Sequence, residues 1–466
     1  MGIGLAGAVL PLGADVSPVM ARLSAYMAEA AMRPLPAEVI EKTKHHILDT
    51  LAAMISGAAL PPGQVALKYA KARAGENTST IVASKFLSSP PEAALVNAML
   101  AHSDETDDSH APSRSHPGCA SVPAALAAGE LFGVDGARLI RAVALGYDVG
   151  PRVTMTMGAL AWELATHFSA HSIASCFSAG ASAACVAGLN AQQMRWVLDY
   201  TAQQASGVAA WQRDTDHIEK SLVFTGFSTR NGVTAALLVE AGGTGVDDIF
   251  SGADNYLQAY APKADPAGLV EKLGERYEIT RTNIKKWTVG SPIQAPLDAI
   301  EIIQKKRPFE ADQVKKVLVK MAASEVRTVN NREMPDICLQ HMIAVMLMDK
   351  TASFAAAHDK PRMKDPAILK HRAKIEVVHD EEIERHIPNR EAIIELTFAD
   401  GSKASEYVKA VRGTPENPMP RAEVDAKCRV LIAPVLGAAN TKKLVETIWG
   451  LETVQDVRAL RPLLQA

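Results

Sequence analysis

A chain of 466 residues is too long for one ordinary hydrophobic core, so its length favours two or three domains. Apolar residues make up 48% and charged residues 22% of the sequence, which is typical of a globular protein. The formal net charge of −3 excludes a general attraction to nucleic acid or to an anionic membrane, so an anionic ligand requires a local cluster of cations.

The cysteines and the N-terminus indicate the compartment. Five cysteines are dispersed without a CxxC pair, which favours a reducing cytoplasm and argues against a disulfide framework or a structural zinc site. Residues 1–14 are apolar, contain no basic residue and are too short to span a membrane. We interpret them as an N-terminal extension rather than a signal peptide, and we expect a cytoplasmic protein without nucleic-acid or membrane partners.

Apolar residues follow a helical period over most of residues 16–273 and again over 421–464. The segments 136–146 and 267–273 are among those predicted to be helical. Within the first part, residues 169–187 are rich in alanine, serine and glycine, which predicts a helix buried in a bundle rather than a membrane span. Beyond residue 277 the pattern changes. Strands are predicted over 314–322, 373–378, 392–398 and 403–408, and helices over 293–305 and 339–348.

The change and return of periodicity predict the domain organisation. The fold class is mainly α, with a large all-helical domain formed by both chain ends, residues 15–276 and 413–466. A smaller α+β domain, residues 277–412, is inserted between the two parts of the helical domain.

The most polar segment, residues 102–116, reads HSDETDDSHAPSRSH and lies between two alanine-rich segments that are predicted to be helical. A loop held between two rigid helices is a common way to position catalytic groups. A carboxylate beside a histidine can tune the pKa of both groups for acid–base chemistry near neutral pH. The spacing leaves open which of the four carboxylates points inward.

Other candidate groups follow the loop. His167 and His171 are one helical turn apart, which would suit a metal, but there is no HExxH motif and no clear third ligand, so we predict no metal. Lys220 and the pair Lys285 and Lys286 lie among apolar neighbours and could bind carboxylates. No GxGxxG, GxxxxGK[ST] or GxSxG motif supports nucleotide binding or serine hydrolysis.

Several segments resemble the MmgE/PrpD family, which includes 2-methylcitrate dehydratase, cis-aconitate decarboxylase and iminodisuccinate epimerase. The resemblance rests on NAMLAHSDETDDSH…HPGCASVPAALAAGE, HSIASCFSAGASAACVAGL, DHIEKSLVFTGFSTRNGV, KKWTVGSPIQAPLDA and MPDICLQHMIAVMLMD. It implies a subunit of two domains with the active site in the cleft between them. It further implies a homodimer, a small-molecule carboxylate substrate, and no metal or organic cofactor.

The resemblance also assigns residues. The loop residues Ser109 and His116 and the two lysines Lys220 and Lys285 match active-site positions of the family. His341 falls where the decarboxylase-like members tend to have tyrosine.

Three positions depart from the family pattern. Its first loop aspartate corresponds to either Asp104 or Glu105, and its Gly-x-His histidine corresponds to His171 only with a shift of two residues. Gln294 stands where a histidine is common.

The leading hypothesis is a lyase that acts on a small di- or tricarboxylate through α-proton abstraction or decarboxylation, similar to 2-methylcitrate dehydratase. Lys220, Lys285 and Arg114 would bind carboxylates, with Lys286 and His102 as further binding residues. His116 or His171 would move the proton, and Asp104 or Glu105 would orient the loop histidine. One alternative is a two-base epimerase of a dicarboxylate, and another is a catalytically silent carboxylate-binding dimer.

Overall fold

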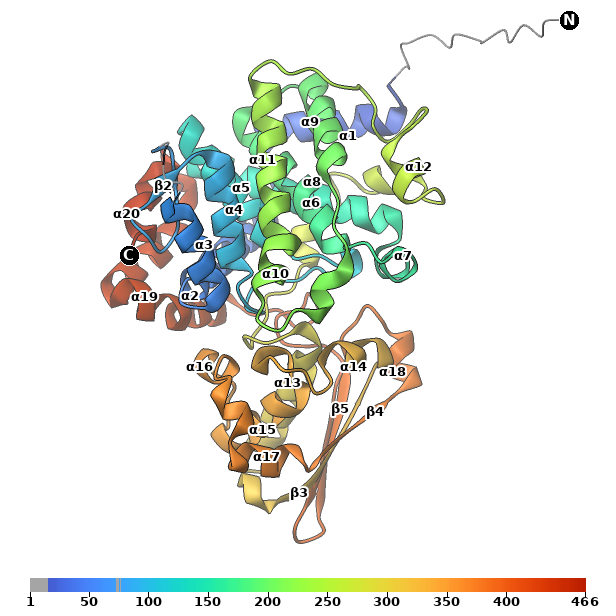
Figure 1. Ribbon diagram of the computed structural model, residues 1–466, viewed down its shortest axis with the longest axis vertical. Helices are drawn as coiled ribbons and strands as arrows, with labels where there is room; N and C mark the ends of the chain where they lie inside the picture. The colour runs from blue at the N-terminus through green and yellow to red at the C-terminus, as the bar shows by residue number, and fades with distance from the viewer. Residues whose placement is uncertain (1–15, 73–74, 76) are drawn as a thin grey trace, which may run out of the picture.

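The structure is a computed structural model that describes residues 16–72, 75 and 77–466, and it has two lobes (Figure 1). The upper lobe in this view is helical, and the lower lobe contains a sheet with helices beside it. The predicted mainly α fold class is confirmed. The predicted N-terminal extension, residues 1–14, lies outside the described residues.

The helical lobe is built from both ends of the chain. Its helices are α1 (Pro18–Glu29), α2 (Ala37–Gly57), α3 (Pro61–Ala72), α4 (Pro90–Ala101), α5 (Gly118–Phe132), α6 (Gly136–Met157), α7 (Ala159–Thr166), α8 (Ala170–Ala187), α9 (Ala191–Gln204), α10 (Ile218–Ser221), α11 (Phe227–Glu240), α12 (Tyr256–Tyr260), α19 (Arg421–Trp449) and α20 (Arg461–Leu464). Two very short strands, β1 (Ser79–Thr80) and β2 (Leu87–Ser88), pair antiparallel beside them. The C-terminal helix α19 packs on α2, so the chain returns to the lobe in which it began.

Helix α8 is the centre of this lobe and packs against α5, α6 and α11. All but one of its residues are buried, as expected from its small side chains. Its length and composition would also suit a membrane span, but 94% of it is buried inside the protein, as in the core helix of a bundle. Close approach depends on glycine, because a Cβ at Gly150 of α6 would lie 2.1 Å from Ser178 Oγ of α8.

The smaller lobe combines a sheet with helices. It contains α13 (Ser291–Lys306), β3 (Val314–Met321), α14 (Ala323–Val329), α15 (Leu339–Asp349), α16 (Phe354–Ala357), α17 (Pro366–Arg372), β4 (Ile375–His379), α18 (Glu381–Arg385), β5 (Ala392–Phe398) and β6 (Lys403–Val408). The strand order is β4-β3-β5-β6, with β3 and β4 parallel and the other pairs antiparallel. Alternate residues of β5 are buried, so the period of two seen in the sequence marks the face that packs on α13.

In the described part of the chain, the buried apolar side chains fall into two clusters. One cluster takes residues from Met20 to Ile284 and from Met419 to Leu464, and the other takes residues from Trp287 to Val411. The change of core therefore falls between Ile284 and Trp287, a few residues after the change in sequence pattern at 277. We propose that the two clusters are the cores of the two domains that the sequence predicts.

Two expected helices differ from the structure in informative ways. The helix expected over 136–146 continues to Met157, because its glycines permit contact with α8 instead of ending the helix. The helix expected over 267–273 is a short 3-10 turn, Pro266–Val270.

The close contact between α6 and α8 gives a stability prediction. Gly150→Ala should lower the free energy of unfolding by about 2 kcal/mol, since the new methyl group would also lie 2.3 Å from the backbone oxygen of Ala174. Gly450→Ala is the matched control, because the nearest atom to its Cβ would be 3.7 Å away. Urea unfolding should place the control within about 0.5 kcal/mol of the parent. Equal effects of the two changes would contradict the packing argument.

Candidate active site

The polar segment 102–116 connects α4 to α5 and is buried rather than solvated. Its four carboxylates, at Asp104, Glu105, Asp107 and Asp108, are each at most 5% exposed. A buried carboxylate is strongly destabilising unless it is paired and hydrogen-bonded. Each of the four is paired, and the partners divide them into carboxylates that anchor the loop and carboxylates that face the site.

Asp108 anchors the loop to three helices. One oxygen lies 2.9 Å from His46 Nδ1 of α2 and accepts a hydrogen bond from the hydroxyl of Tyr147 of α6. The other oxygen accepts from the backbone N–H of Gly118 at 3.2 Å. This contact also places a negative charge at the N-terminus of α5, which the helix dipole favours. The exit of the loop is thereby fixed.

Asp107 orients two histidines. One of its oxygens lies 3.0 Å from His102 Nδ1, and the other lies 3.3 Å from His116 Nδ1 and 3.7 Å from Lys285 Nζ. Burial alone would raise the pKa of Asp107, but the two histidines hold that pKa well below its usual range. The carboxylate therefore faces the Nδ1 side of His116 and favours a proton there, which leaves Nε2 as the proton acceptor.

Glu105 is the carboxylate held between the two predicted lysines. One oxygen pairs with Lys220 Nζ, and the other lies 3.4 Å from Lys285 Nζ, which also donates to the backbone oxygen of Glu105 at 2.9 Å. Although burial would raise the pKa of Glu105, Lys220 and Lys285 hold it well below its usual range. Of the two alternatives left open by the sequence, Glu105 is the one beside the lysines.

Asp104 points elsewhere. It accepts from the N–H of Thr106 at 3.0 Å and lies 3.0 Å from Nε2 of His358, a residue of the smaller lobe. Its carboxylate therefore links the loop to the other lobe.

An aromatic ring packs between the histidines. Phe224 lies in the π-helical turn Leu222–Gly226, a rare backbone form that is frequent at functional sites. His171 stacks on it at 3.9 Å between ring centroids, and His102 stacks on it at 4.6 Å. Burial lowers the pKa of His116 and holds that of His171 well below its usual range, so both imidazoles are neutral at pH 7 and can accept a proton.

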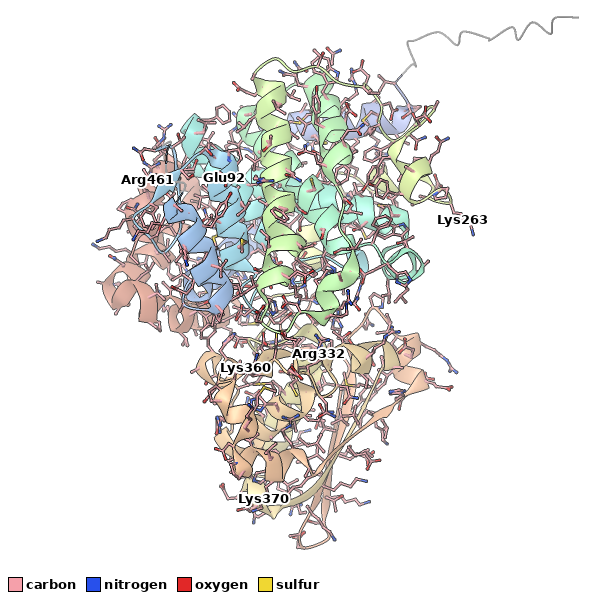
Figure 2. All side chains as sticks on the ribbon, viewed as in Figure 1. Glu92, Lys263, Arg332, Lys360, Lys370 and Arg461 are labelled. Carbon is pink, nitrogen blue, oxygen red and sulfur yellow. The ribbon has the colours of Figure 1, made fainter. Side chains whose placement is uncertain are left out.

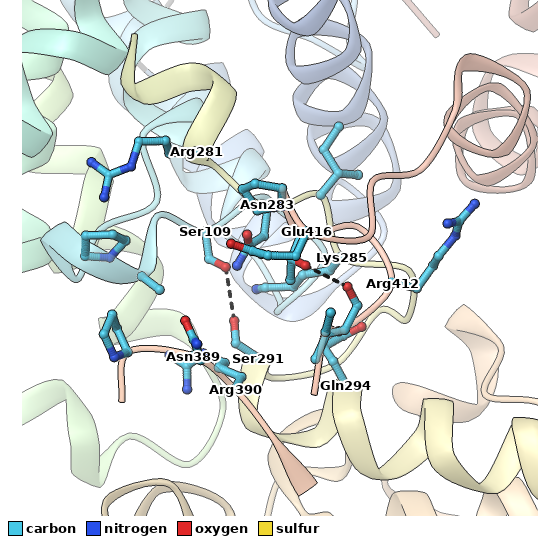
Figure 3. Close-up of a pocket in the computed structure, with 18 of the residues that line it drawn as sticks. Ser109, Arg281, Asn283, Lys285, Ser291, Gln294, Asn389, Arg390, Arg412 and Glu416 are labelled. Carbon is cyan, nitrogen blue, oxygen red and sulfur yellow. Dashed lines mark hydrogen bonds between the residues drawn. The ribbon is translucent and has the colours of Figure 1, made fainter. Parts of the chain in front are cut away.

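These groups border a cavity between the two lobes with a volume of about 1070 Å³. Of the predicted site residues, it is lined by Glu105, Arg114, His116, His171 and Lys220. A smaller cavity of about 220 Å³ adjoins it and is lined by Ser109 and Lys285 (Figure 3). There the Ser291 hydroxyl donates to the Ser109 hydroxyl at 3.3 Å, which brings the smaller lobe against the loop.

Four predicted residues lie outside these cavities or behind their walls. His341 is buried on α15 near Arg372 and Arg362, where burial lowers its pKa to about 4. Lys286 pairs with Glu301 at 2.6 Å and borders a different surface groove. His102 and Asp104 are fully or almost fully buried behind the cavity wall.

The predicted HxxxH pair does not share a helix. His167 caps the end of α7 with a left-handed backbone, φ 63°, and His171 lies in the first turn of α8. Both side chains nevertheless line the large cavity.

Several residues of the site lie outside the motifs that the sequence shows. Glu163 lies 3.7 Å from Arg114 and 3.8 Å from His171, and Trp211 packs edge-on against His171. His358 of the smaller lobe pairs with Asp104 of the loop at 3.0 Å, and Asp336 of the same lobe is buried near enough to feel the charges of His358 and of the loop carboxylates. Burial and the neighbouring carboxylates raise the pKa of Asp336 to about 7, and Asp104 raises the pKa of His358 to about 9 against the effect of burial. Only the polar loop and the segments around the lysines have a sequence pattern distinctive enough to predict site residues.

Among the residues that the structure describes, two overlapping sets of buried groups have ligand atoms close enough to hold a metal ion. They are His102, Glu105 and His217, and His102, Asp107 and Cys119, with the atoms of each set within 4.8 Å of one another. A cation there would compete with the lysines for Glu105 and with the histidine protons for Asp107. The prediction that no metal is needed stays a prediction.

Gln294, where the family pattern commonly has histidine, supports the segment after Lys285. Its amide donates to the backbone oxygens of Trp287 at 2.8 Å and Val289 at 2.9 Å, and it accepts from the N–H of Trp287. These hydrogen bonds fix the backbone of the segment between Lys285 and α13.

Paired lysines, histidines with lowered pKa values and buried carboxylates thus lie together at a cavity between a helical lobe and an α+β lobe. Side chains of these kinds are able to bind anions and to exchange protons. The MmgE/PrpD N-terminal domain matches residues 21–268, and the MmgE/PrpD C-terminal domain matches residues 287–451. The chain therefore belongs to the MmgE/PrpD family.

Similar proteins cover nearly the whole chain. The cis-aconitate decarboxylase-like protein oryM of Aspergillus oryzae is 24% identical over 96% of this chain and 97% of its own length. A cis-aconitate decarboxylase of Aspergillus terreus is 23% identical, with 96% of each chain covered. The cis-aconitate decarboxylase of Homo sapiens is 23% identical over 92% of this chain and 90% of its own length.

The pair between His358 and Asp104 predicts a pH dependence of stability. Because the folded pKa of His358 is raised to about 9, its contribution is fully present below the unfolded pKa of about 6.5 and is lost as pH rises towards 9. His358→Gln should lower the free energy of unfolding by about 2 kcal/mol at pH 6 and by less at pH 9. The exposed His379→Gln serves as the control. Denaturant unfolding across this range measures the difference, and a pH-independent loss would argue against the ion pair.

Proposed function

We propose that this protein is a lyase that acts on a small di- or tricarboxylate. One observation carries the proposal. Lys220 and Lys285 both pair with Glu105, and this carboxylate lies at the edge of a cavity that two neutral histidines also line. The similarity to cis-aconitate decarboxylases over the full chain supports it. Among lyase reactions, decarboxylation of a cis-aconitate-like acid is the first candidate.

The lysines supply the binding of carboxylates. An ammonium group has three donors, and pairing with Glu105 leaves further donors on Lys220 for a substrate carboxylate in the cavity. Arg114, which also lines the cavity, adds a guanidinium that can bind a carboxylate through two parallel hydrogen bonds. Since Glu105 and Asp107 already balance the two lysines, a bound polyanion would raise the pKa of the neighbouring histidines.

The chemistry requires stabilisation of charge next to a carboxylate. In decarboxylation of an unsaturated tricarboxylate, the carbon–carbon bond to the departing CO₂ breaks and its electron pair forms a new double bond. The electrons of the old double bond move to the carbon next to a retained carboxylate, and this carbon takes up one proton. The lysines would stabilise the charge that spreads onto the retained carboxylate, and His116 would deliver the proton after its pKa is raised by the substrate.

Dehydration uses the same groups in another order. A neutral His116 or His171 would remove the proton next to a carboxylate, and the hydroxyl would leave with a proton from the partner group.

A two-base epimerase is the second candidate. Its support is that His116 and His171 line the same cavity with ring centroids 5.5 Å apart, so two acid–base groups could address one carbon.

A product assay tests these reactions. The full-length protein would be incubated in heavy water with cis-aconitate, 2-methylcitrate and iminodisuccinate, and the products followed by proton NMR. We expect CO₂ and an acid with one deuterium on the carbon that was protonated. A new alkene without CO₂ would indicate dehydration, and deuterium exchange without bond cleavage would indicate epimerisation. No reaction with any acid, despite binding, would favour a silent carboxylate-binding protein.

Two histidine variants test the assignment of roles. His116→Ala should lower turnover by roughly 10²–10⁴-fold because it removes the proton donor or acceptor, with little change in the thermal midpoint. His341→Ala should leave turnover per folded molecule nearly unchanged, because that ring lies outside the cavity. Turnover and thermal unfolding of both variants give the comparison. If His116→Ala stays active and loses about 1–2 kcal/mol of stability instead, His171 would take its place in the mechanism.

A further inference from the structure

Three buried side chains meet beside the large cavity. His102 caps the end of α4, Glu105 lies in the loop that follows, and His217 directly precedes α10. Each is at most 5% exposed, and each offers one ligand atom within 4.8 Å of those of the other two. Two histidines and one glutamate are the protein ligands of zinc in several enzymes.

The histidine nitrogens at this point lack hydrogen-bond partners among the described residues. Neither ring nitrogen of His217 makes a hydrogen bond, and its Nε2 lies 3.8 Å from Oε1 of Glu105. Nε2 of His102 is also without a partner in the described part of the chain. Buried polar atoms are usually hydrogen-bonded, so exceptions that occur together indicate a place for an ion or a water molecule.

Both imidazoles are prepared to bind a cation. Nδ1 of His102 lies 3.0 Å from a carboxylate oxygen of Asp107, which favours a proton on Nδ1 and leaves the lone pair on Nε2. A carboxylate in this position commonly orients a metal-binding histidine. Burial and the charge of Lys220 lower the pKa of His217 to about 3. The His217 ring is therefore neutral at pH 7 and does not have to lose a proton to bind an ion.

The backbone of His217 is held in an uncommon conformation. Its φ is 68°, in the left-handed region that few residues other than glycine adopt. The segment before it is fixed by the smaller lobe, since Arg332 donates to the backbone oxygen of Gln212 at 3.0 Å and Lys360 to that of Thr215 at 3.2 Å. Figure 2 shows both cationic side chains at the boundary of the two lobes. Contacts between the lobes thus help to place this imidazole.

Glu105 is the group that an ion would share with the lysines. Its Oε1 pairs with Lys220 Nζ, and its Oε2 lies 3.4 Å from Lys285 Nζ. The two oxygens of a carboxylate accept independently, so an ion beside His217 would take Oε1 from Lys220 while Lys285 keeps Oε2. Glu105 and Lys220 both line the large cavity, so an ion that enters the cavity can reach this oxygen.

We infer that His102, Glu105 and His217 form a binding site for a divalent transition metal ion of the zinc type, which displaces Lys220 from Glu105. Two nitrogen ligands favour zinc over Mg²⁺ and Ca²⁺, which prefer oxygen. The ion takes no part in the proposed reaction and competes with it for a carboxylate. The site stands independently of the proposed function, and only its effect on turnover rests on that function.

Titration calorimetry with Zn²⁺ tests the site in the full-length protein. We expect the parent to bind a single ion per chain. His217→Asn removes the imidazole but keeps a residue that tolerates a left-handed backbone, and it should weaken zinc binding by roughly 100-fold or more. His341→Ala is the matched control and should bind zinc as the parent does. The His341 ring is equally buried, and among the described residues its two nitrogens also lack partners. No zinc binding by the parent, or equal binding by His217→Asn, would overturn the inference.

The visible spectrum of Co²⁺ provides a test that needs no variant. An ion held by three protein side chains and a water molecule is four-coordinate, and four-coordinate Co²⁺ absorbs visible light far more strongly than the hydrated ion. Zn²⁺ should abolish this absorption, because it binds nitrogen and oxygen ligands more tightly than Co²⁺. A parent protein whose Co²⁺ spectrum remains that of the hydrated ion would contradict the proposed ligand set.

A lysine variant tests the displacement. Lys220→Met removes the cation that competes for Oε1 of Glu105, so it should tighten zinc binding by about tenfold or more. Lys286→Met is the control, because Lys286 pairs with Glu301 and borders a different groove. It should leave the zinc affinity unchanged. Unchanged or weaker binding in Lys220→Met would show that the ion does not replace Lys220 and would overturn the inference.

Turnover separates the metal site from the proposed reaction. Zn²⁺ should inhibit the conversion of whichever acid reacts, since it takes Glu105 from Lys220. His217→Asn should keep nearly the turnover of the parent and resist this inhibition. If no acid reacts, the proposed function fails, while the titrations and the Co²⁺ spectrum still decide the metal site. Full turnover of the parent at a saturating concentration of zinc would overturn the inferred displacement.

Discussion

The structure of the site depends on the neutralisation of buried carboxylates by cations from distant parts of the chain. Glu105 and Asp107 are buried in the loop after α4, while Lys220 comes from α10 and Lys285 from the junction between the lobes. Breaking such a buried pair by removing one partner costs about 3–5 kcal/mol. The loop, α10 and the junction must therefore fold as one unit, which holds the lysines at the cavity.

The junction itself is fixed by backbone contacts. Ser109 and Asn283 exchange two backbone hydrogen bonds, at 3.0 Å and 2.8 Å, so the loop and the first crossing between the lobes form a small bridge. The N–H of Ile284 donates to the backbone oxygen of Gly413 on the second crossing at 3.0 Å. Gly413 has φ +98°, and a Cβ there would lie 1.8 Å from the oxygen of Ile284, so only glycine permits the two crossings to approach. The bridge and this contact together set the position of the smaller lobe against the loop.

The sequence determined most of the secondary structure and the fold class. Periods of 3.6 and 2 report which face of a helix or strand is buried, and they placed α8, α13, β5 and β6 within a few residues. The length of α6 could not be predicted in this way, because Gly146 and Gly150 have a low helix propensity. The helix nevertheless continues through both glycines, since their missing side chains allow α6 to pack closely on serines of α8. The motifs around the loop and Lys220 located the site because several rare polar groups occur there among apolar neighbours.

Only the tertiary structure decided which polar groups meet. The choice of Glu105 over Asp104 depends on Lys220 and Lys285, which are 115 and 180 residues away in the chain, and no local pattern encodes such pairing. The positions of Lys286 beside Glu301 and of His341 in the smaller lobe depend equally on packing. Local periodicity reports burial, whereas the partners of a buried charge are set by how distant elements pack. For that reason the sequence predicted which types of side chain form the site, whereas only the tertiary structure shows which individual residues lie together there.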